Sequence, residues 1–226
     1  MTRETFHEEL ERTELELLSL GELAGTAVQR AVDALVHHDD AKAQAVIDGD
    51  DPIDELYLKI DSGVLQMLAL QSPVAQDLRL ISAILHCDLH LERIGDQAVN
   101  VAKLYLHTKD ARGSEAMRQQ IEEMGTLVVS MVRTAMESFG RRDLDLAFKV
   151  PTMDDPVDRL NRTTHLEALK LAGDPAQLDW GLNMNMAARA LERVGDNAVD
   201  IAEQVGFLLT GEFREFTDAS HPVTME

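Results

Sequence analysis

Residues 91–102 read LERIGDQAVNVA, and one hundred positions later residues 191–202 read LERVGDNAVDIA. Eight of the twelve positions are identical, so the chain contains a repeated unit. The apolar residues recur at helical spacing, which places the Glu and the Asp of each copy on one helix face, about 6 Å apart along the axis. These two pairs, Glu92/Asp96 and Glu192/Asp196, are candidate cation sites.

The repeat extends beyond these two segments. Residues 50–54, DDPID, match residues 154–158, DDPVD, at an offset of 104. The offset changes to 100 near residues 71–73, where a loop tolerates a deletion. The offset of 104 also relates Asp39 and Ala43 to Asp143 and Ala147, which extends the repeat toward the start of each half.

The composition favours helix packed on helix. Apolar residues make up 45% of the 226 residues and aromatic residues only 4%. We predict an all-α fold of two tandem three-helix bundles related by internal duplication, in residues 1–110 and 111–211, followed by a C-terminal tail, 212–226. The six long helices are expected at about 5–38, 52–71, 73–107, 115–142, 156–171 and 175–210, with short helical pieces near 41–47 and 144–150.

Capping residues and prolines set the expected helix starts. A side-chain oxygen before a proline is typical of an N-cap followed by the first helical residue. The expected N-caps are Thr5, Asp51, Ser72, Ser114, Asp155 and Asp174.

The charge balance excludes some partners and suggests others. With 21 basic and 41 acidic side chains, the formal net charge is −20, which argues against nucleic acid as a direct partner. Cys87 is the only cysteine, so we expect a buried thiol and neither an internal disulfide nor a thiolate metal site. The acidic N-terminus does not resemble a secretory signal, and no apolar run approaches membrane-spanning length. We therefore expect a cytoplasmic protein that meets membranes only through partners.

The acid pairs extend into longer stripes that differ between the halves. Asp88, Glu92, Asp96 and Asn100 follow one another at four-residue spacing, and the equivalent positions are Ala188, Glu192, Asp196 and Asp200. Like charges at this spacing cost a helix ~0.2 to 0.5 kcal/mol, which a shared cation would offset. Only the central pair is acidic in both halves, so the two sites are expected to differ in occupancy.

Glycine in each motif predicts a close helix neighbour. Gly95 and Gly195 lie mid-helix, where glycine costs about 1 kcal/mol relative to alanine. A neighbouring helix could bring in the second acid pair of each half. The predicted metal ligands are therefore all carboxylates, which suit divalent or trivalent Fe, Mn or Mg, and also Ca, better than structural zinc: Asp50, Asp54, Glu92, Asp96, Asp154, Asp158, Glu192, Asp196 and Asp200.

Simpler roles remain open for these residues. The acids near residues 50 and 154 could be helix caps or dipole partners, and the mid-helix acids a solvated face. Arg93 and Arg193 could pair with the acids, bind an anion or pack on the surface. His86 and His90 have ligand spacing but point away from Glu92, and the sequence shows no nucleophile motif.

The paired motifs resemble the PhoU family, the accessory regulators of phosphate-specific transport. The resemblance rests on residues 77–80, DLRL, followed by LERIGD at 91–96 and LERVGD at 191–196, and it covers about residues 1–211. It implies two three-helix bundles, dimerisation, and metal binding through E(D)xxxD motifs, here Asp50/Asp54, Glu92/Asp96, Asp154/Asp158 and Glu192/Asp196. Ala188 and Asn100 depart from equal motifs and put equal metal stoichiometry in doubt.

The same resemblance implies a function. A member of this family would act as a non-enzymatic adaptor between the ATPase subunit of the phosphate ABC transporter and the phosphate-sensing histidine kinase. It would restrain uptake and starvation signalling when phosphate is plentiful. The alternatives are a carboxylate-bridged metalloenzyme, such as a phosphatase or oxidase, and a structural bundle whose acids are only solvated.

Overall fold

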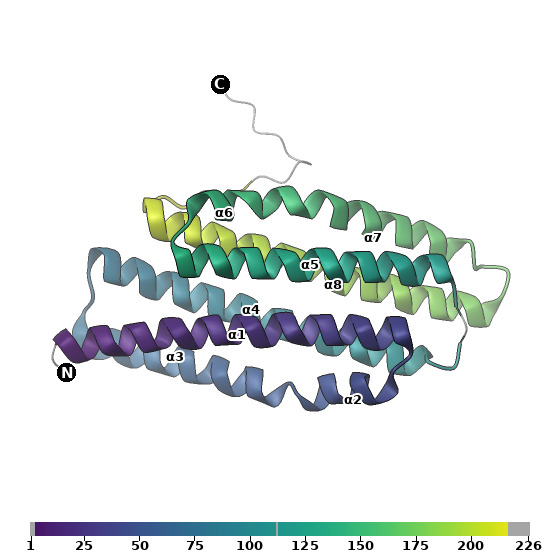
Figure 1. Cartoon of the computed structure of the whole chain (residues 1–226), viewed down its shortest axis with the longest axis horizontal. Helices are drawn as coiled ribbons and strands as arrows, with labels where there is room; N and C mark the ends of the chain where they lie inside the picture. Colours follow the sequence, from purple (N-terminus) through teal and green to yellow (C-terminus); the bar gives the residue numbers. More distant parts are fainter. Residues whose placement is uncertain (1–2, 112, 217–226) are drawn as a thin grey trace, which may run out of the picture.

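The computed structural model describes residues 3–111 and 113–216, and all of its regular structure there is helical (Figure 1). The described elements follow one another in this order: α1 (Arg3–His37), α2 (Asp40–Asp48), α3 (Asp51–Gln71), α4 (Ala75–Thr108), α5 (Glu115–Arg141), α6 (Leu144–Lys149), the 3-10 turn η1 (Pro151–Met153), α7 (Asp154–Leu169) and α8 (Pro175–Thr210). The all-α prediction is confirmed. The six long helices expected from the sequence correspond to α1, α3, α4, α5, α7 and α8, and the two short pieces to α2 and α6.

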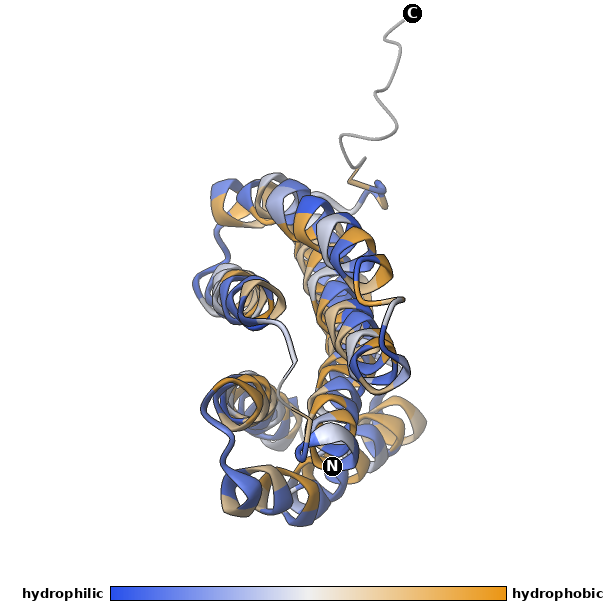
Figure 2. Ribbon diagram, turned by 90° about the vertical axis from the view of Figure 1, so that its right-hand side faces the viewer, coloured by the Kyte–Doolittle hydropathy of each residue, from blue (hydrophilic) through white to orange (hydrophobic). Residues whose placement is uncertain are grey.

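The helices form two three-helix bundles that share one core. The first bundle contains α1, α3 and α4, and the second contains α5, α7 and α8. Helix α4 packs along α8 and α1 along α5, so α3 and α7 lie at opposite edges of the molecule (Figure 1), and an end-on view shows the long helices side by side (Figure 2). Buried side chains from both bundles belong to the same apolar cluster. The duplicated units are therefore packed together as one body.

Residues at equivalent positions of the repeat have the same structural role in both bundles. Asp39 accepts a hydrogen bond from the backbone N of Lys42 at 2.9 Å and caps α2, and Asp143 accepts one from Leu146 N at 3.1 Å and caps α6. Ala43 and Ala147, four residues after these caps, are both fully buried. Each short helix is thus fixed at its start by an aspartate and held to the core by an alanine.

Several predicted helix starts are wrong by a few residues. Helix α1 already begins at Arg3, before Thr5. Ser72 does not cap α4: it adopts φ 43° and ends α3, because the residue before a proline is disfavoured in the helical region, and α4 begins at Ala75. Asp51 and Asp155 lie inside the first turns of α3 and α7. The Asp174 cap is confirmed by its bond to Ala176 N at 2.9 Å, whereas Ser114 occupies the N-cap position without a side-chain bond.

Apolar positions in the long helices face inward. In α4 the fully buried residues Ile84, Cys87, Leu91 and Ile94 follow one another at three- and four-residue spacing. Burial raises the pKa of the Cys87 thiol, which makes this side chain part of the core, as expected. Over the described residues, no helix is both long and apolar enough to cross a lipid bilayer.

Candidate metal centres

The first acid cluster joins the start of α3 to the middle of α4. Burial raises the pKa of Asp50, and the neighbouring charges of Asp54 and Asp96 raise it further. Burial likewise raises the pKa of Glu92, followed by the charges of Asp96 and Asp54. Acids on the facing helix therefore raise the pKa of each of these two carboxyl groups, which indicates that the four predicted residues of this half lie close together.

The second cluster repeats this arrangement between α7 and α8 and is buried more deeply. Asp154 is 9% exposed, and burial followed by the charges of Asp196 and Asp158 raises its pKa to about 7. Asp196 is exposed to solvent, yet partial desolvation and then the charges of Glu192 and Asp158 raise its pKa to about 6. The structure therefore also brings together the predicted acids of this half.

The motif glycines make room for the facing carboxylates. A Cβ atom on Gly195 would stand 2.8 Å from Oδ1 of Asp154. A Cβ atom on Gly95 would stand 3.1 Å from Ile53 and 3.8 Å from Oδ1 of Asp50. Glycine at these mid-helix positions lets a second helix place a carboxyl group against the backbone of the first, as the sequence suggested.

The acids at the starts of α3 and α7 do not cap these helices, although Asp54 and Asp154 lie in first turns, where negative charge complements the helix dipole. Asp50 occupies the N-cap position of α3 but makes no capping hydrogen bond, and Asp154 begins α7 without one. Oδ1 of Asp154 is buried and has no hydrogen-bond partner. A buried, unpaired carboxyl oxygen is costly and indicates a missing partner.

Nearby cations only partly offset the acids. Arg189 lies 3.3 Å from Oε1 of Glu192, and Arg162 lies 3.9 Å from Asp158. Arg93 lowers the pKa of Glu92 against the stronger effects of burial and of the neighbouring acids. Arg93 and Arg193 are themselves exposed, and exposed ion pairs contribute little stability.

The carboxylate oxygens of the two clusters suit a hard cation, although their present positions do not form a closed coordination site. Across residues 3–111 and 113–216, no three acidic, histidine or cysteine side chains converge tightly enough to hold a metal ion as they stand. Crowded carboxylates repel one another, and a cation between them reverses that repulsion. The unpaired oxygen of Asp154 and the all-carboxylate chemistry match the ligands that Mg, Mn, Ca or Fe ions take in proteins.

Asp88 in the first half and Asp200 in the second half extend the two acid stripes, and their environments differ from each other. Asp88 is 1% exposed, and neither of its carboxyl oxygens has a hydrogen-bond partner. Burial raises its pKa to about 8, followed by the charges of Asp61 and Glu92. Asp200 instead contacts His90 at 3.4 Å across the bundle boundary. The two clusters are therefore unequal in surroundings, as the sequence led us to expect.

Asp61 and the contact of His90 with α8 were not expected from the sequence. Asp61 lies seven residues after Asp54 in α3, a spacing that returns to the same helix face and could have revealed it. His90 faces α8, where its Nδ1 lies 2.8 Å from Oδ1 of Asn197. That contact joins residues 107 positions apart, so no local pattern could have predicted it.

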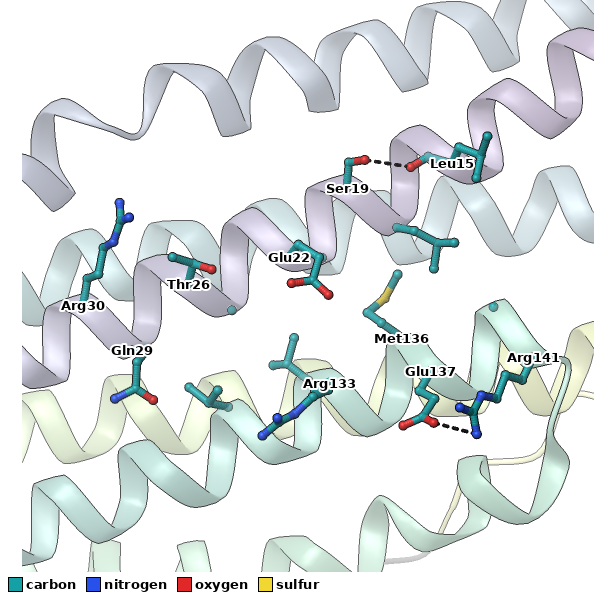
Figure 3. A pocket seen from close by; sticks show the side chains of 16 residues that line it. Leu15, Ser19, Glu22, Thr26, Gln29, Arg30, Arg133, Met136, Glu137 and Arg141 are labelled. Carbon is teal, nitrogen blue, oxygen red and sulfur yellow. Dashed lines mark hydrogen bonds and ion pairs between the residues drawn. The ribbon is translucent and has the colours of Figure 1, made fainter.

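A groove lies between α1 and α5, and no residue of either acid cluster lines it. It encloses about 940 Å³ and has apolar side chains and glycines along its length. Figure 3 shows Met136 reaching toward α1, with Glu22 and Arg133 facing the groove from opposite walls. Its charged lining residues carry both signs: Glu22, Arg30, Arg133, Glu137 and Arg141.

Replacing Gly195 should disturb the second cluster selectively. In Gly195→Ala the new methyl group would meet the Asp154 carboxyl and push it toward water, so we expect the pKa of Asp154 to fall by about one unit or more from about 7. NMR titration of the carboxyl carbon measures this value. Gly95→Ala is the matched control, because its methyl group meets Ile53 in the other bundle. An unchanged pKa in Gly195→Ala would show that the glycine does not set the position of Asp154.

Comparison with known proteins gives a consistent result over both repeats. The sequence model of the PhoU domain matches residues 17–105 and 121–205. The chain is 37% identical over 217 residues to the phosphate-specific transport system accessory protein PhoU homolog of Pseudomonas aeruginosa, covering 96% of this chain and 88% of that protein. It is 31% identical to the homolog of Clostridium acetobutylicum, covering 96% of this chain and all of that protein.

Solved structures show the same arrangement of helices. The crystal structure of PhoU from Pseudomonas aeruginosa superposes with a TM-score of 0.87 at 38% identity, covering 92% of this chain and 100% of that one. The phosphate transport system regulatory protein PhoU from Streptococcus pneumoniae gives a TM-score of 0.85 at 28% identity, covering 92% and 99%. The structural similarity to these two proteins therefore extends over both bundles of this chain.

Proposed function

This chain belongs to the PhoU family, and we propose that it is an accessory regulator of phosphate-specific transport. The two curated relatives described above are named for that transport system, and both bundles of this chain take part in the match. These relatives are named as accessory proteins rather than enzymes, which favours a regulatory role.

We further propose how it regulates. The protein restrains phosphate uptake and starvation signalling when phosphate is plentiful, and it does so as an adaptor between the transporter ATPase subunit and the phosphate-sensing histidine kinase. It works in the cytoplasm as a homodimer and reaches the membrane only through these partners. The family resemblance supports each of these points.

Metal ions complete the adaptor in this proposal. The observation that supports this most directly is the pairing of acids from two helices in each bundle, with an unpaired buried oxygen on Asp154. Asp50, Asp54, Glu92 and Asp96 hold metal in the first bundle, and Asp154, Asp158, Glu192 and Asp196 hold it in the second, with Asp200 as a further ligand. A cation held by these carboxylates would neutralise their mutual repulsion where α3 packs on α4 and α7 packs on α8, and it would thereby fix the surface that partners meet.

The regulatory role can be tested in cells that lack this chain. At high phosphate we expect such cells to express a starvation-gene reporter at least about tenfold above wild-type cells, because the kinase is no longer restrained. The wild-type chain should restore repression, and so should Asp179→Asn, an exposed acid of α8. The double variant Asp154→Asn/Asp196→Asn should fail to restore it while remaining folded.

Two outcomes would overturn parts of this proposal. Repression and uptake that do not depend on the chain would refute the regulatory role itself. Full repression by the double variant would leave the regulator without a need for the second acid cluster. The metalloenzyme alternative would gain support from hydrolysis of a phosphate ester by the manganese-loaded protein that is lost in Asp196→Asn.

A further inference from the structure

A second kind of site lies where α4 and α8 meet between the two bundles. An open pocket of about 550 Å³ is lined by residues from 97 to 107 of α4 and from 183 to 193 of α8. Its charged side chains are those of Lys103, Arg189 and Arg193, and His107 lies beside them. In the part of the chain that the structure describes, none of its lining residues is acidic.

The positive charge of this lining contrasts with the negative charge of the chain as a whole. The formal net charge is −20, yet three cations converge on one pocket. Over residues 3–111 and 113–216, neither Lys103 nor Arg193 has an acidic oxygen within ion-pair distance, and only Arg189 has a partner, Glu192 at 3.3 Å. The remaining polar lining consists of carboxamide side chains, which also donate hydrogen bonds: Gln97, Asn100, Asn183 and Asn185.

The internal repeat provides a comparison within the same molecule. At an offset of 100, Lys103 corresponds to Glu203 and Arg189 to Leu89. In that equivalent region His90 lies 2.8 Å from Asn197 and 3.4 Å from Asp200, so side chains join the two helices there. Only one of the two equivalent places is both open and basic, and duplication of the fold alone does not account for this difference.

We propose that the pocket between α4 and α8 binds a phosphate group, either as free inorganic phosphate or as a phosphate monoester. Guanidinium and ammonium groups donate charge-assisted hydrogen bonds to phosphate oxygens, and the carboxamides add neutral donors. The carboxamide oxygens of Asn100 and Asn185, which also line the pocket, can accept from the O–H that inorganic phosphate carries at neutral pH and sulfate lacks. Anion binding follows from the pocket, whereas the choice of phosphate also rests on the proposed function.

The position of the pocket links it to the second acid cluster. Arg189 lines the pocket and also lies 3.3 Å from Oε1 of Glu192. An anion in the pocket would therefore compete with Glu192 for this guanidinium group.

Binding can be measured on the purified full-length chain after treatment with a chelator, so that no metal at the acid clusters captures the anion. Isothermal titration with inorganic phosphate and with phenyl phosphate separates the free ion from a monoester. We expect at least one of them to bind, and we expect sulfate to bind at least about tenfold more weakly. Arg193→Gln and Lys103→Gln should each weaken binding at least about tenfold, because each removes a charge-assisted contact.

Arg93→Gln is the matched control, since Arg93 is the exposed repeat equivalent of Arg193 and does not line the pocket. Its affinity for the anion should equal that of the wild type, and circular dichroism confirms that all variants remain folded. Failure of both phosphates to bind, equal binding of sulfate, or equal effects of Arg93→Gln and Arg193→Gln would each overturn the proposal. None of these results depends on the reporter measurement in cells, so failure here is distinguishable from failure of the regulatory role.

Discussion

At pH 9 and without metal, we expect Asp88→Asn to unfold about 10 °C above the wild-type protein, whereas at pH 4 the two should melt at nearly the same temperature. Asp88 is 1% exposed, and its carboxyl oxygens have no hydrogen-bond partners. Asparagine has nearly the same shape and stays neutral at every pH. The variant therefore removes only the cost of ionising this buried group.

The sign follows from the proton balance. Burial first, and then Asp61 and Glu92, raise the pKa of Asp88 from 3.8 to about 8 in the folded protein. Between these values the unfolded chain has released this proton and the folded chain retains it, so stability falls as the pH rises from about 4 to about 8. At 1.36 kcal/mol per pKa unit, the full loss of stability is roughly 5 to 6 kcal/mol, and each kcal/mol corresponds to about 2–4 °C for a chain of this size.

Thermal melts from pH 4 to pH 9 in the presence of a chelator provide the measurement. Asp179→Asn is the control, because Asp179 is an exposed aspartate of α8 and its replacement should shift the melting temperature equally at all pH values. If wild type and Asp88→Asn lost stability in parallel, Asp88 would already be ionised or solvated in the fold.

Metal addition should reverse the stability order of wild type and cluster variants. We expect the double variant Glu192→Gln/Asp196→Asn to be more stable than wild type in a chelator, because it removes repulsion among acids that share one site. With excess Mn²⁺ we expect wild type to be the more stable protein, since only its carboxylates gain a shared cation. The first-cluster variant Glu92→Gln/Asp96→Asn should show the same reversal.

The expected size of this effect is large enough to measure at equilibrium. A ligand at one hundred times its dissociation constant stabilises the folded state by about 2.7 kcal/mol. This corresponds to a shift of roughly 5–10 °C for a chain of this size. Elemental analysis of wild type and of each cluster variant after dialysis gives the stoichiometry at each cluster. We expect the two clusters to differ because Asp88 is buried whereas Asp200 contacts His90.

A solvated acidic face would behave differently. Exposed acids without a shared cation would give variants that are slightly more stable than wild type with and without Mn²⁺, and no metal would remain after dialysis. Mg²⁺ and Ca²⁺ titrations extend the comparison among hard cations. Asp179→Asn again serves as the control for loss of one charge outside the clusters.

Local patterns predicted most of the helices because the responsible interactions are local. Asp174 caps α8 as the Asp-Pro pattern predicted, and the buried residues of α4 keep their helical spacing. Prediction failed at Ser72, where the conformational restriction imposed by Pro73 ends α3 instead of starting α4.

The duplication, the helical class and the acids of each bundle could be predicted from the sequence, because a repeat with eight of twelve identical positions and a fixed spacing are local properties of the chain. The packing of α4 along α8 and of α1 along α5 became visible only in the tertiary structure. It buried Asp88 and left Oδ1 of Asp154 unpaired, and it brought Lys103 of α4 near Arg189 of α8. Burial and contacts across 86 or more positions depend on how whole helices pack, and no local pattern encodes that packing.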